Sequence, residues 1–251
     1  MKKYIVYSIL LAGAALSSCS SSFLDQEPPL YIEPGDIYNN ADRLEATMLG
    51  LYGSLKNDAS NSFMGGKTYL VFDNRSEDIV NADPNLVTLA NTYKFNVGKT
   101  DAENTVTWSM AYAAINRANT FLEELEKAKE VAGEKYEQYK AEAKFVRAFA
   151  YYYLNNLYAT PYVIAPEAKS VPLRLKAEKD GENNALKRST VKEVYEQILS
   201  DLENVNALPV KTAASEETVT RATQAAAYML KMRVYMAMNN WTEAVKVGKL
   251  V

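Results

Sequence analysis

The sequence predicts a mostly α-helical fold of tetratricopeptide-like helical hairpins, with a small irregular, β-containing loop region. Three observations carry this prediction. Apolar residues recur with helical spacing over most of the chain. Residues 60–100 lose that spacing and are rich in turn formers. A turn at Asn239-Asn240 precedes Trp241-x-x-Ala244, as between paired helices of a tetratricopeptide hairpin, although the full repeat consensus is absent.

The first helix is expected from Asp36 to about Asn57. Its buried stripe has the spacing i, i+4, i+7, i+8, i+11 and consists of Leu44, Met48, Leu51, Tyr52 and Leu55. Two short strands are expected in the following segment, at Tyr69–Phe72 and at Tyr93–Val97, where the second alternates apolar and polar residues. This segment is the β-containing part of the predicted fold.

Two long helices are expected next, from about Glu103 to Gly133 and from about Glu134 to Tyr158. The second is apolar around most of its circumference and should be central to the core. We expect core packing for the large aromatic residues on the helical stripes, namely Trp108, Tyr112, Phe145, Phe149 and Tyr152. Arg147 lies among apolar neighbours and is expected to pair with a carboxylate such as Glu142 or Glu123.

The carboxy-terminal part begins with an irregular segment containing Pro161, Pro166 and Pro172. Thr190-x-x-Glu193 has the pattern of a capping box and predicts a helix start. A long helix is expected at Arg221–Met238, and another opens at Trp241, which should pack within the hairpin. Because that last helix has no cap or tail, we expect a truncated chain that leaves apolar residues uncovered: Met229, Met232, Tyr235 and Val245.

The amino terminus has the features of an export signal. Lys2 and Lys3 precede an apolar stretch from Tyr4 to Leu16, which is too short for a membrane span. Leu16-Ser17-Ser18-Cys19 resembles a bacterial lipobox, and Cys19 is the only cysteine of the chain. An ordinary signal followed by a chance cysteine is the alternative. We therefore divide the chain into a signal peptide (1–18), a lipidated Cys19 with a serine-containing tether (19–35), and a helical domain (36–251).

Composition excludes several classes of function. The net charge of −3 gives no basic surface for nucleic acid. The absence of histidine excludes Ser-His-Asp and Cys-His catalysis and any histidine-containing zinc site. Carboxylate-only chemistry of the glycosidase type stays open, but no spacing singles out a pair among the 31 acidic residues. We expect a protein that is not an enzyme and needs no metal or cofactor.

The candidate ligand-binding residues lie in the irregular stretch between Phe72 and Tyr93. Binding residues concentrate on loops held by a rigid scaffold, and recognition of a sugar needs aromatic faces together with amide, carboxylate or guanidinium groups. The residues of these types are Asp73, Asn74, Arg75, Asp78, Asn81 and Tyr93. The alternative is a solvated acidic loop in which Asp and Asn serve turn chemistry.

Taken in order, the motifs resemble those of the SusD-like (RagB/SusD) family, surface lipoproteins of nutrient uptake in Bacteroidetes. The resemblance covers residues 16 to 251, with Ala159-Thr160 standing where family members often have a glycine pair. The motifs are the lipobox with Phe23-Leu24-Asp25, Trp108-x-x-x-Tyr112-x-x-Ile115-Asn116-Arg117-Ala118-Asn119, Ala141-Glu142-Ala143-Lys144-Phe145-Val146-Arg147-Ala148-Phe149, Tyr158-Ala159-Thr160-Pro161, Arg188-Ser189-Thr190-Val191, and Arg221-Ala222-Thr223.

The resemblance implies a SusD-like α-α superhelix whose helical hairpins support a ligand-binding region. It implies an outer-membrane, lipid-anchored protein at the cell surface that binds oligosaccharides and delivers them to a SusC-like TonB-dependent transporter. Peptides are the ligands in the RagB branch. A tetratricopeptide-like scaffold for protein interaction, without a small ligand, is a further alternative. Family members are considerably longer, and their carboxy-terminal half supplies much of the ligand surface.

Overall fold

The computed structural model describes residues 36–56, 63–80, 82, 88–181, 184–210 and 220–251. Contacts divide the chain between Ile37 and Tyr38, and the elements below lie in the unit Tyr38–Val251, apart from the start of η2. Cys19, the signal segment 1–18 and Asn81 lie outside the described residues. The elements run in the order η2 (Asp36–Asn39), α2 (Ala41–Lys56), α3 (Lys67–Asn74), α4 (Ala90–Tyr93), α5 (Ala102–Lys127), α6 (Lys129–Ala132), η3 (Gly133–Lys135), α7 (Tyr136–Tyr158), α8 (Val191–Asp201), η4 (Val205–Ala207), α10 (Gln224–Ala237) and α11 (Trp241–Gly248).

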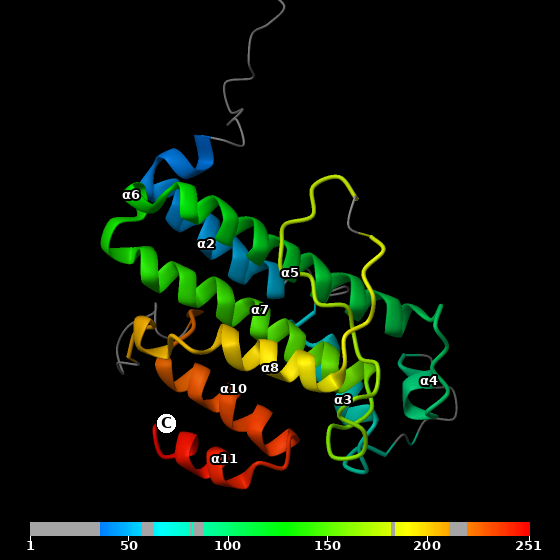
Figure 1. Cartoon of the computed structure of the whole chain (residues 1–251). Helices are drawn as coiled ribbons and strands as arrows, with labels where there is room; N and C mark the ends of the chain where they lie inside the picture. The colour runs from blue at the N-terminus through cyan, green and yellow to red at the C-terminus, as the bar shows by residue number, and fades with distance from the viewer. Residues whose placement is uncertain (1–35, 57–62, 81, 83–87, 182–183, 211–219) are drawn as a thin grey trace, which may run out of the picture. The chain divides into compact units, whose positions relative to one another are not determined.

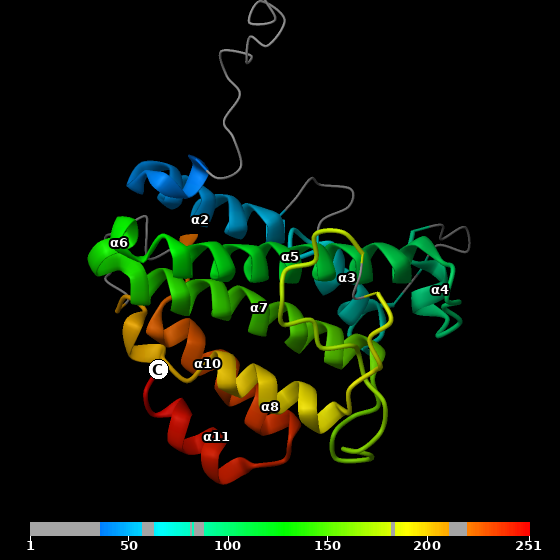
Figure 2. The ribbon, with the colours of Figure 1, turned by 45° about the horizontal axis from the view of Figure 1, so that its top comes forward.

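The long helices stack side by side and alternate in direction. Both views show α5, α7, α8, α10 and α11 following one another across the molecule, with α2 against the first two (Figures 1 and 2). The hairpins α5–α7 and α10–α11 confirm the expected helical-hairpin fold. Among the helices that the structure describes, none is long and apolar enough to cross a membrane.

α7 is the central helix, as its apolar circumference predicted. It packs against α5, α8, α2 and α10, and both Val146 and Leu154 are fully buried. Phe145 is buried, while Trp108, Tyr112, Phe149 and Tyr152 are half-buried and pack against the same core. The expected core role of these aromatic residues is therefore confirmed, although four of them keep an accessible face.

Capping hydrogen bonds mark the first residues of two helices, α8 and α2. Thr190 Oγ1 accepts a hydrogen bond from Glu193 N at 3.1 Å, and Glu193 Oε2 accepts from Thr190 N at 2.6 Å. This is the predicted capping box of α8. Asn40 Oδ1 accepts from Asp42 N at 2.8 Å, which starts α2 five residues after the expected Asp36.

The two predicted strands are wrong. Tyr69–Phe72 lies within α3, whose residues Thr68 and Val71 are buried at the helical spacing i, i+3. Tyr93 ends α4, and Phe95 has a φ of +53°, a left-handed conformation that a strand cannot contain. Apolar runs of four or five residues are too short to distinguish the periodicity of a helix from that of a strand. Within the described residues the only β-type pairing is a single bridge between Lys169 and Thr190.

Arg147 pairs with a carboxylate, as expected, but its partner is Asp201 rather than Glu142 or Glu123. Arg147 forms a bidentate pair with Asp201 of α8, with nitrogen–oxygen distances of 2.8 and 2.6 Å, and donates to Asn119 Oδ1 of α5 at 2.8 Å. Burial acts to lower the pKa of Arg147, but the hydrogen bonds and charge of Asp201 raise it. Arg147 thus joins three helices, and Asp201 is 54 residues away in the sequence.

The predictions for residues near the carboxy terminus differ in outcome. The expected uncovered surface is present at Met229 and Val245, which are 41% and 59% exposed, whereas Met232 and Tyr235 are half-buried. Trp241, expected to pack within the hairpin, is 57% exposed, and its indole N–H donates to Asn239 Oδ1. The hairpin instead closes on the small side chain of Ala244 and on Val247, which are both buried.

Candidate functional site

One long side of α5 is only half covered by the rest of the molecule. Thr105, Trp108, Ser109, Tyr112 and Asn116 are spaced i, i+3, i+4, i+7 and i+11, so they lie along one face of the helix. Residues on the other side, such as the fully buried Ala111, Ile115 and Ala118, pack into the core. The α5 sequence therefore presents a mixed aromatic and polar stripe outside the core.

A second wall comes from the segment that follows Pro172. Tyr112 Oη donates to the carbonyl oxygen of Pro172 at 2.7 Å. Asn116 Nδ2 donates to the carbonyl of Glu178 at 3.1 Å, and Asn116 Oδ1 accepts from Glu178 N at 2.7 Å. Asn119 Nδ2 donates to two further carbonyls of the same segment. Side chains of α5 thus supply hydrogen-bond partners for the backbone of an irregular segment and fix that segment beside the helix.

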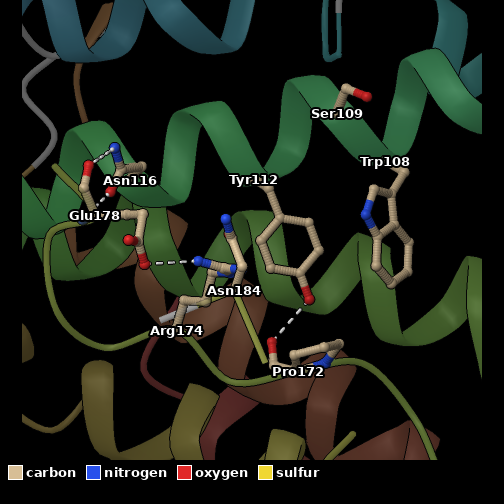
Figure 3. Close-up of a pocket in the computed structure, with 8 residues that line it drawn as sticks. All are labelled: Trp108, Ser109, Tyr112, Asn116, Pro172, Arg174, Glu178 and Asn184. Atoms are coloured by element: carbon tan, nitrogen blue, oxygen red, sulfur yellow. Dashed lines mark hydrogen bonds and ion pairs between the residues drawn. The ribbon is translucent and has the colours of Figure 1, made fainter. Parts of the chain in front are cut away.

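Between these walls lies a cavity of about 500 Å³, a size typical of small-ligand sites. Figure 3 shows its lining residues, which are Trp108, Ser109, Tyr112, Asn116, Pro172, Arg174, Glu178 and Asn184. Arg174 Nη1 donates to Glu178 Oε2 at 2.9 Å, and Arg174 Nη2 donates to Asn184 Oδ1 at 3.2 Å. The cavity therefore combines aromatic side chains with a compensated pair of charges.

A second cavity of about 350 Å³ adjoins the first at Trp108 and Ser109. Its other lining residues are Lys99, Asn104, Thr105 and Tyr158. Burial raises the pKa of Tyr158 to about 12, against the smaller opposing effect of the Arg75 charge, so this phenol stays protonated near neutral pH. We call the two cavities together the α5 groove.

Trp108 is held by aromatic neighbours on two sides. Its ring centroid lies 5.0 Å from that of Tyr112 and 5.0 Å from that of Tyr158, with an interplanar angle of 88° in the second pair. Figure 3 shows its indole nitrogen on the side toward Tyr112. Among the described residues, no hydrogen-bond acceptor is recorded for this indole N–H.

These groups are suited to binding a polyhydroxylated ligand. Aromatic side chains can pack against the apolar faces of sugar rings, while amide, carboxylate and guanidinium groups bond to hydroxyls. Among the described residues that line the groove, Glu178 is the one carboxylate, and it is paired with Arg174. A glycosidase needs two facing carboxyl groups, an arrangement that the described lining residues do not supply. Within the described residues no cluster of acidic or cysteine side chains is suited to a metal ion.

Comparison with known proteins identifies the family. The model of the family described as "Starch-binding associating with outer membrane" matches residues 22–236, which is most of the chain. The chain belongs to the SusD-like family.

Three relatives define how much of a SusD-like protein is present. A SusD superfamily protein from Bacteroides fragilis is 62% identical, with a TM-score of 0.83 over 86% of this chain and 50% of that one. SusD-like protein P25 of Formosa agariphila is 26% identical over 96% of this chain and 44% of its own length. A SusD-like carbohydrate binding protein from Bacteroides vulgatus, at 20% identity and a TM-score of 0.70, shows the shared fold. The chain thus spans about half the length of these relatives.

Four of the candidate residues predicted from sequence lie outside the α5 groove. Asp73 and Asn74 end α3, Asp78 is exposed after it, and Tyr93 ends α4. None of these four lines either cavity of the groove. Asn81 is outside the described residues. Their role in binding remains a proposal.

Arg75 lies beside the α5 groove. Its Nη1 donates to the carbonyl oxygen of Leu157 at 3.4 Å. It also lines a small cavity together with Asn104 and Tyr158, two residues that line the groove itself. The structure therefore places Arg75 beside the groove, in a cavity that shares two residues with it.

Sequence reasoning missed the groove because its residues have two roles. The helical spacing of Trp108 and Tyr112 predicts core packing, and both do pack on the core while they also line the cavity. A usable signal was the polar pair Ser109 and Asn116 on the same helical face as the two aromatics. The i, i+4 charges of Arg174 and Glu178 gave no signal, because the segment carrying them has no helical period.

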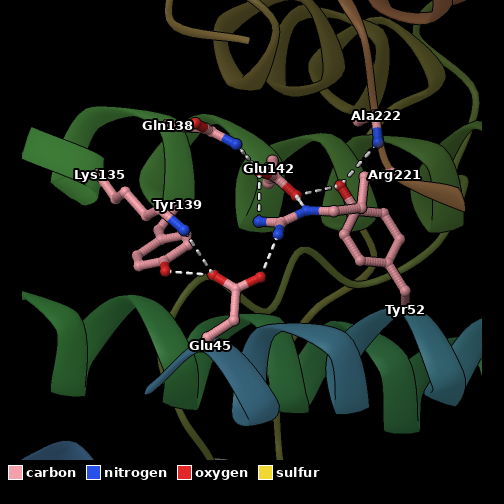
Figure 4. Close-up of polar contacts among 8 residues, drawn as sticks. All are labelled: Glu45, Tyr52, Lys135, Gln138, Tyr139, Glu142, Arg221 and Ala222. Atoms are coloured by element: carbon pink, nitrogen blue, oxygen red, sulfur yellow. Dashed lines mark hydrogen bonds and ion pairs between the residues drawn. The ribbon is translucent and has the colours of Figure 1, made fainter. Parts of the chain in front are cut away.

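A second polar cluster of this SusD-like chain is closed to ligand. Arg221 forms a bidentate pair with Glu142 at 2.8 and 2.7 Å and also pairs with Glu45, which accepts from Tyr139 (Figure 4). Tyr52 donates to Glu142 at 2.7 Å and accepts from Ala222 N at 2.9 Å. We call these residues the Arg221 cluster. It joins α2, α7 and the start of the α10 segment.

The electrostatics of the Arg221 cluster are those of a structural ion pair. The side chains of Arg221 and Glu142 are 2% and 0% exposed, so the charges have only each other and their neighbours for solvation. Burial acts to raise the pKa of Glu45, but the hydrogen bond from Tyr139 and the charges of Arg221 and Lys135 lower it overall. The cluster fixes helices relative to one another and presents no free group to a ligand.

Proposed function

We propose that this SusD-like chain is a cell-surface lipoprotein that binds oligosaccharides without catalysing a reaction and delivers them to a SusC-like TonB-dependent transporter of the outer membrane. The observation that carries the binding part is the first cavity of the α5 groove. There, Trp108 and Tyr112 stand opposite Arg174, Glu178 and Asn184 within one space of about 500 Å³.

The family supports a carbohydrate ligand. The matching family is described as starch-binding, and the Bacteroides vulgatus relative is described as carbohydrate binding. Those descriptions concern the family and a longer protein, so their extension to this chain is part of the proposal. Asp73, Asn74, Arg75, Asp78, Asn81 and Tyr93 are proposed to extend the binding surface from the Arg75 end of the groove.

The binding proposal is tested by calorimetry with the purified chain. The probes are maltohexaose, cellohexaose, xylohexaose and mannohexaose, with neutral hexapeptides to test the RagB-type alternative. We expect saturable heat with at least one hexasaccharide and none with the peptides. Trp241→Phe serves as the matched control, because Trp241 lies outside the groove and should not change the affinity. Heat from the peptides alone would contradict the carbohydrate assignment.

The anchor is tested separately at Cys19. Labelling of cells with a palmitate analogue should mark the protein and lose the mark in Cys19→Ser, because the thiol is the acceptor of the diacylglycerol group. Protease treatment of whole cells should remove the wild-type protein, and a TonB-dependent transporter should co-purify with it. An unlabelled protein that is protected inside the cell would contradict this part of the proposal.

A protein-interaction scaffold is the second candidate, and one observation favours it. The α10–α11 hairpin exposes four apolar side chains, Met229, Met236, Trp241 and Val245, which are 41–59% exposed. Exposed apolar groups of this kind mark protein contacts. A scaffold without a small ligand would retain a protein partner, would lose it on Val245→Asp, and would give no heat with any of the sugars.

A further inference from the structure

We propose that the α5 groove contains two adjoining sugar subsites that share Trp108 as a common aromatic platform, one subsite for each of two neighbouring sugar residues of the ligand. This inference rests on the proposed function and deepens it. It is carried by the arrangement of the two cavities and by how Trp108 is held between them.

Trp108 and Ser109 line both cavities of the groove. The two spaces, of about 500 and 350 Å³, each fall in the range of complete small-molecule sites, which is roughly 300–1,000 Å³. A ligand that occupies both must therefore pass over the Trp108–Ser109 turn of α5. A single sugar ring in one cavity would leave the other filled with water.

The indole is pre-positioned for this role. Tyr112 on one side is fixed by its hydrogen bond to Pro172, and Tyr158 on the other donates to the carbonyl oxygen of Asn104 at 2.7 Å. Both rings contact Trp108 at centroid distances of 5.0 Å. A side chain held on two sides loses little conformational entropy when a ligand packs against it, which favours binding.

Polar groups lie on both sides of Trp108. The first cavity offers Asn116, Arg174, Glu178 and Asn184. The second offers Lys99, Asn104 and Thr105. Each subsite thus has its own hydrogen-bonding groups and shares the aromatic platform with its neighbour. Binding energy should therefore increase when a sugar chain extends from one subsite into the other.

The two tryptophans of the chain allow a direct test. In Trp241→Phe, Trp108 becomes the single indole, and its fluorescence reports on the groove alone. This variant is titrated with glucose, maltose, maltotetraose and maltohexaose, and with the cello- and xylo-oligosaccharides of the same lengths, while calorimetry on the same samples measures binding independently. We expect at least a tenfold rise in affinity from the monosaccharide to the tetrasaccharide of one series, with a blue shift of the Trp108 emission.

Trp108→Phe sharpens the result, because it keeps an aromatic ring in the core-facing position. It should weaken the binding of the longer sugar by about three- to tenfold, the range expected for one aromatic contact, without changing the affinity for the monosaccharide to the same degree. The melting temperature of each variant checks that it is folded. Trp108→Ala should show the larger loss.

The outcomes separate the two proposals. Heat from a hexasaccharide with unchanged Trp108 emission, or equal affinity for the monosaccharide and the hexasaccharide, would overturn the two-subsite inference and leave carbohydrate binding intact. No heat from any sugar with a folded sample would overturn both. A length-dependent affinity with a shifted Trp108 emission would support both.

Discussion

The α5 groove and the Arg221 cluster use similar residues for different purposes. Both contain an arginine paired with a glutamate and neighbouring tyrosines. In the Arg221 cluster the charges of Arg221 and Glu142 are buried and bonded to side chains of other helices. In the groove, Arg174 and Glu178 are partly exposed, lie four residues apart and face a cavity.

The difference shows that burial and connectivity, rather than residue type, separate a structural cluster from a candidate binding site. Removal of one charge from the Arg221 cluster leaves its partner buried in a low-dielectric region, which costs stability. Removal of a group from the groove leaves its partner in contact with water, which costs little stability but removes a contact to the ligand. Four variants test this separation.

The largest effect is expected for Arg221→Met. It leaves Glu142 buried without a counter-charge and should lower the free energy of unfolding by about 3–5 kcal/mol. Urea unfolding measures this loss, and sugar affinity of the folded fraction should stay unchanged. Lys135→Met is the matched control, because Lys135 is exposed and reaches Glu45 only at 3.3 Å, so its loss should cost less than about 1 kcal/mol. A loss below 1 kcal/mol for Arg221→Met would show that the cluster does not stabilise the fold.

Tyr112→Phe should lower both stability and sugar affinity, because the Tyr112 hydroxyl links α5 to the segment that begins at Pro172. Loss of the hydrogen bond to the Pro172 carbonyl should lower the free energy of unfolding by about 1 kcal/mol. It should also weaken sugar binding, because the second wall is less firmly placed. Hydrogen exchange of residues 172–181 measures the loosening. Unchanged exchange together with unchanged affinity would contradict the role given to Tyr112.

Acid should weaken the Arg221 cluster through Glu45. The folded-state pKa of Glu45 is lowered below its ordinary value near 4.5, so its contribution to stability is present above that value and is lost as the pH falls through the folded pKa. The free energy of unfolding should therefore fall below about pH 4.5, and Glu45→Gln should make that fall shallower. Equal pH slopes in the two proteins would contradict the charge pairing of Glu45.

The smallest effect on stability is expected for Asn184→Ala. Asn184 is exposed at the groove and accepts one hydrogen bond from Arg174, so the free energy of unfolding should change by less than about 0.5 kcal/mol. Sugar affinity should fall by about two- to tenfold, which is the value of one hydrogen bond. Asn206→Ala, an exposed asparagine in η4, is the control and should change neither quantity. Equal affinity in the two variants would remove Asn184 from the site.

The sequence predicted features that depend on local spacing. The capping box at Thr190 and Glu193, the buried stripe of α2 and the end of α7 at Tyr158 follow from residues within one or two turns of one another. The hairpin architecture and the family also followed from ordered local motifs. The prediction of strands at Tyr69–Phe72 and Tyr93–Val97 was wrong, because apolar runs this short do not show whether the periodicity is that of a helix or of a strand.

Long-range partners were not predictable in the same way. Arg147 finds Asp201 across 54 residues, and the wall of the α5 groove reaches Asn116 from Glu178 across 62 residues. No local pattern marks which carboxylate or which irregular segment will reach a given helix. For the same reason, the helical spacing of the groove residues Trp108 and Tyr112 predicts a core role and not a groove.

Hydroxyl-radical footprinting of the two tryptophans tests the central claim most directly, that the α5 groove is the carbohydrate site. Each panel hexasaccharide is added at saturating concentration, and oxidation of Trp108 and Trp241 is measured in the same chain by mass spectrometry. Trp241, which is 57% exposed and lies outside the groove, corrects for radicals consumed by the sugar. The expected result is a fall in the oxidation of Trp108 relative to Trp241 with any hexasaccharide that gives calorimetric heat. An unchanged ratio during saturable binding would place the sugar elsewhere and contradict the assignment.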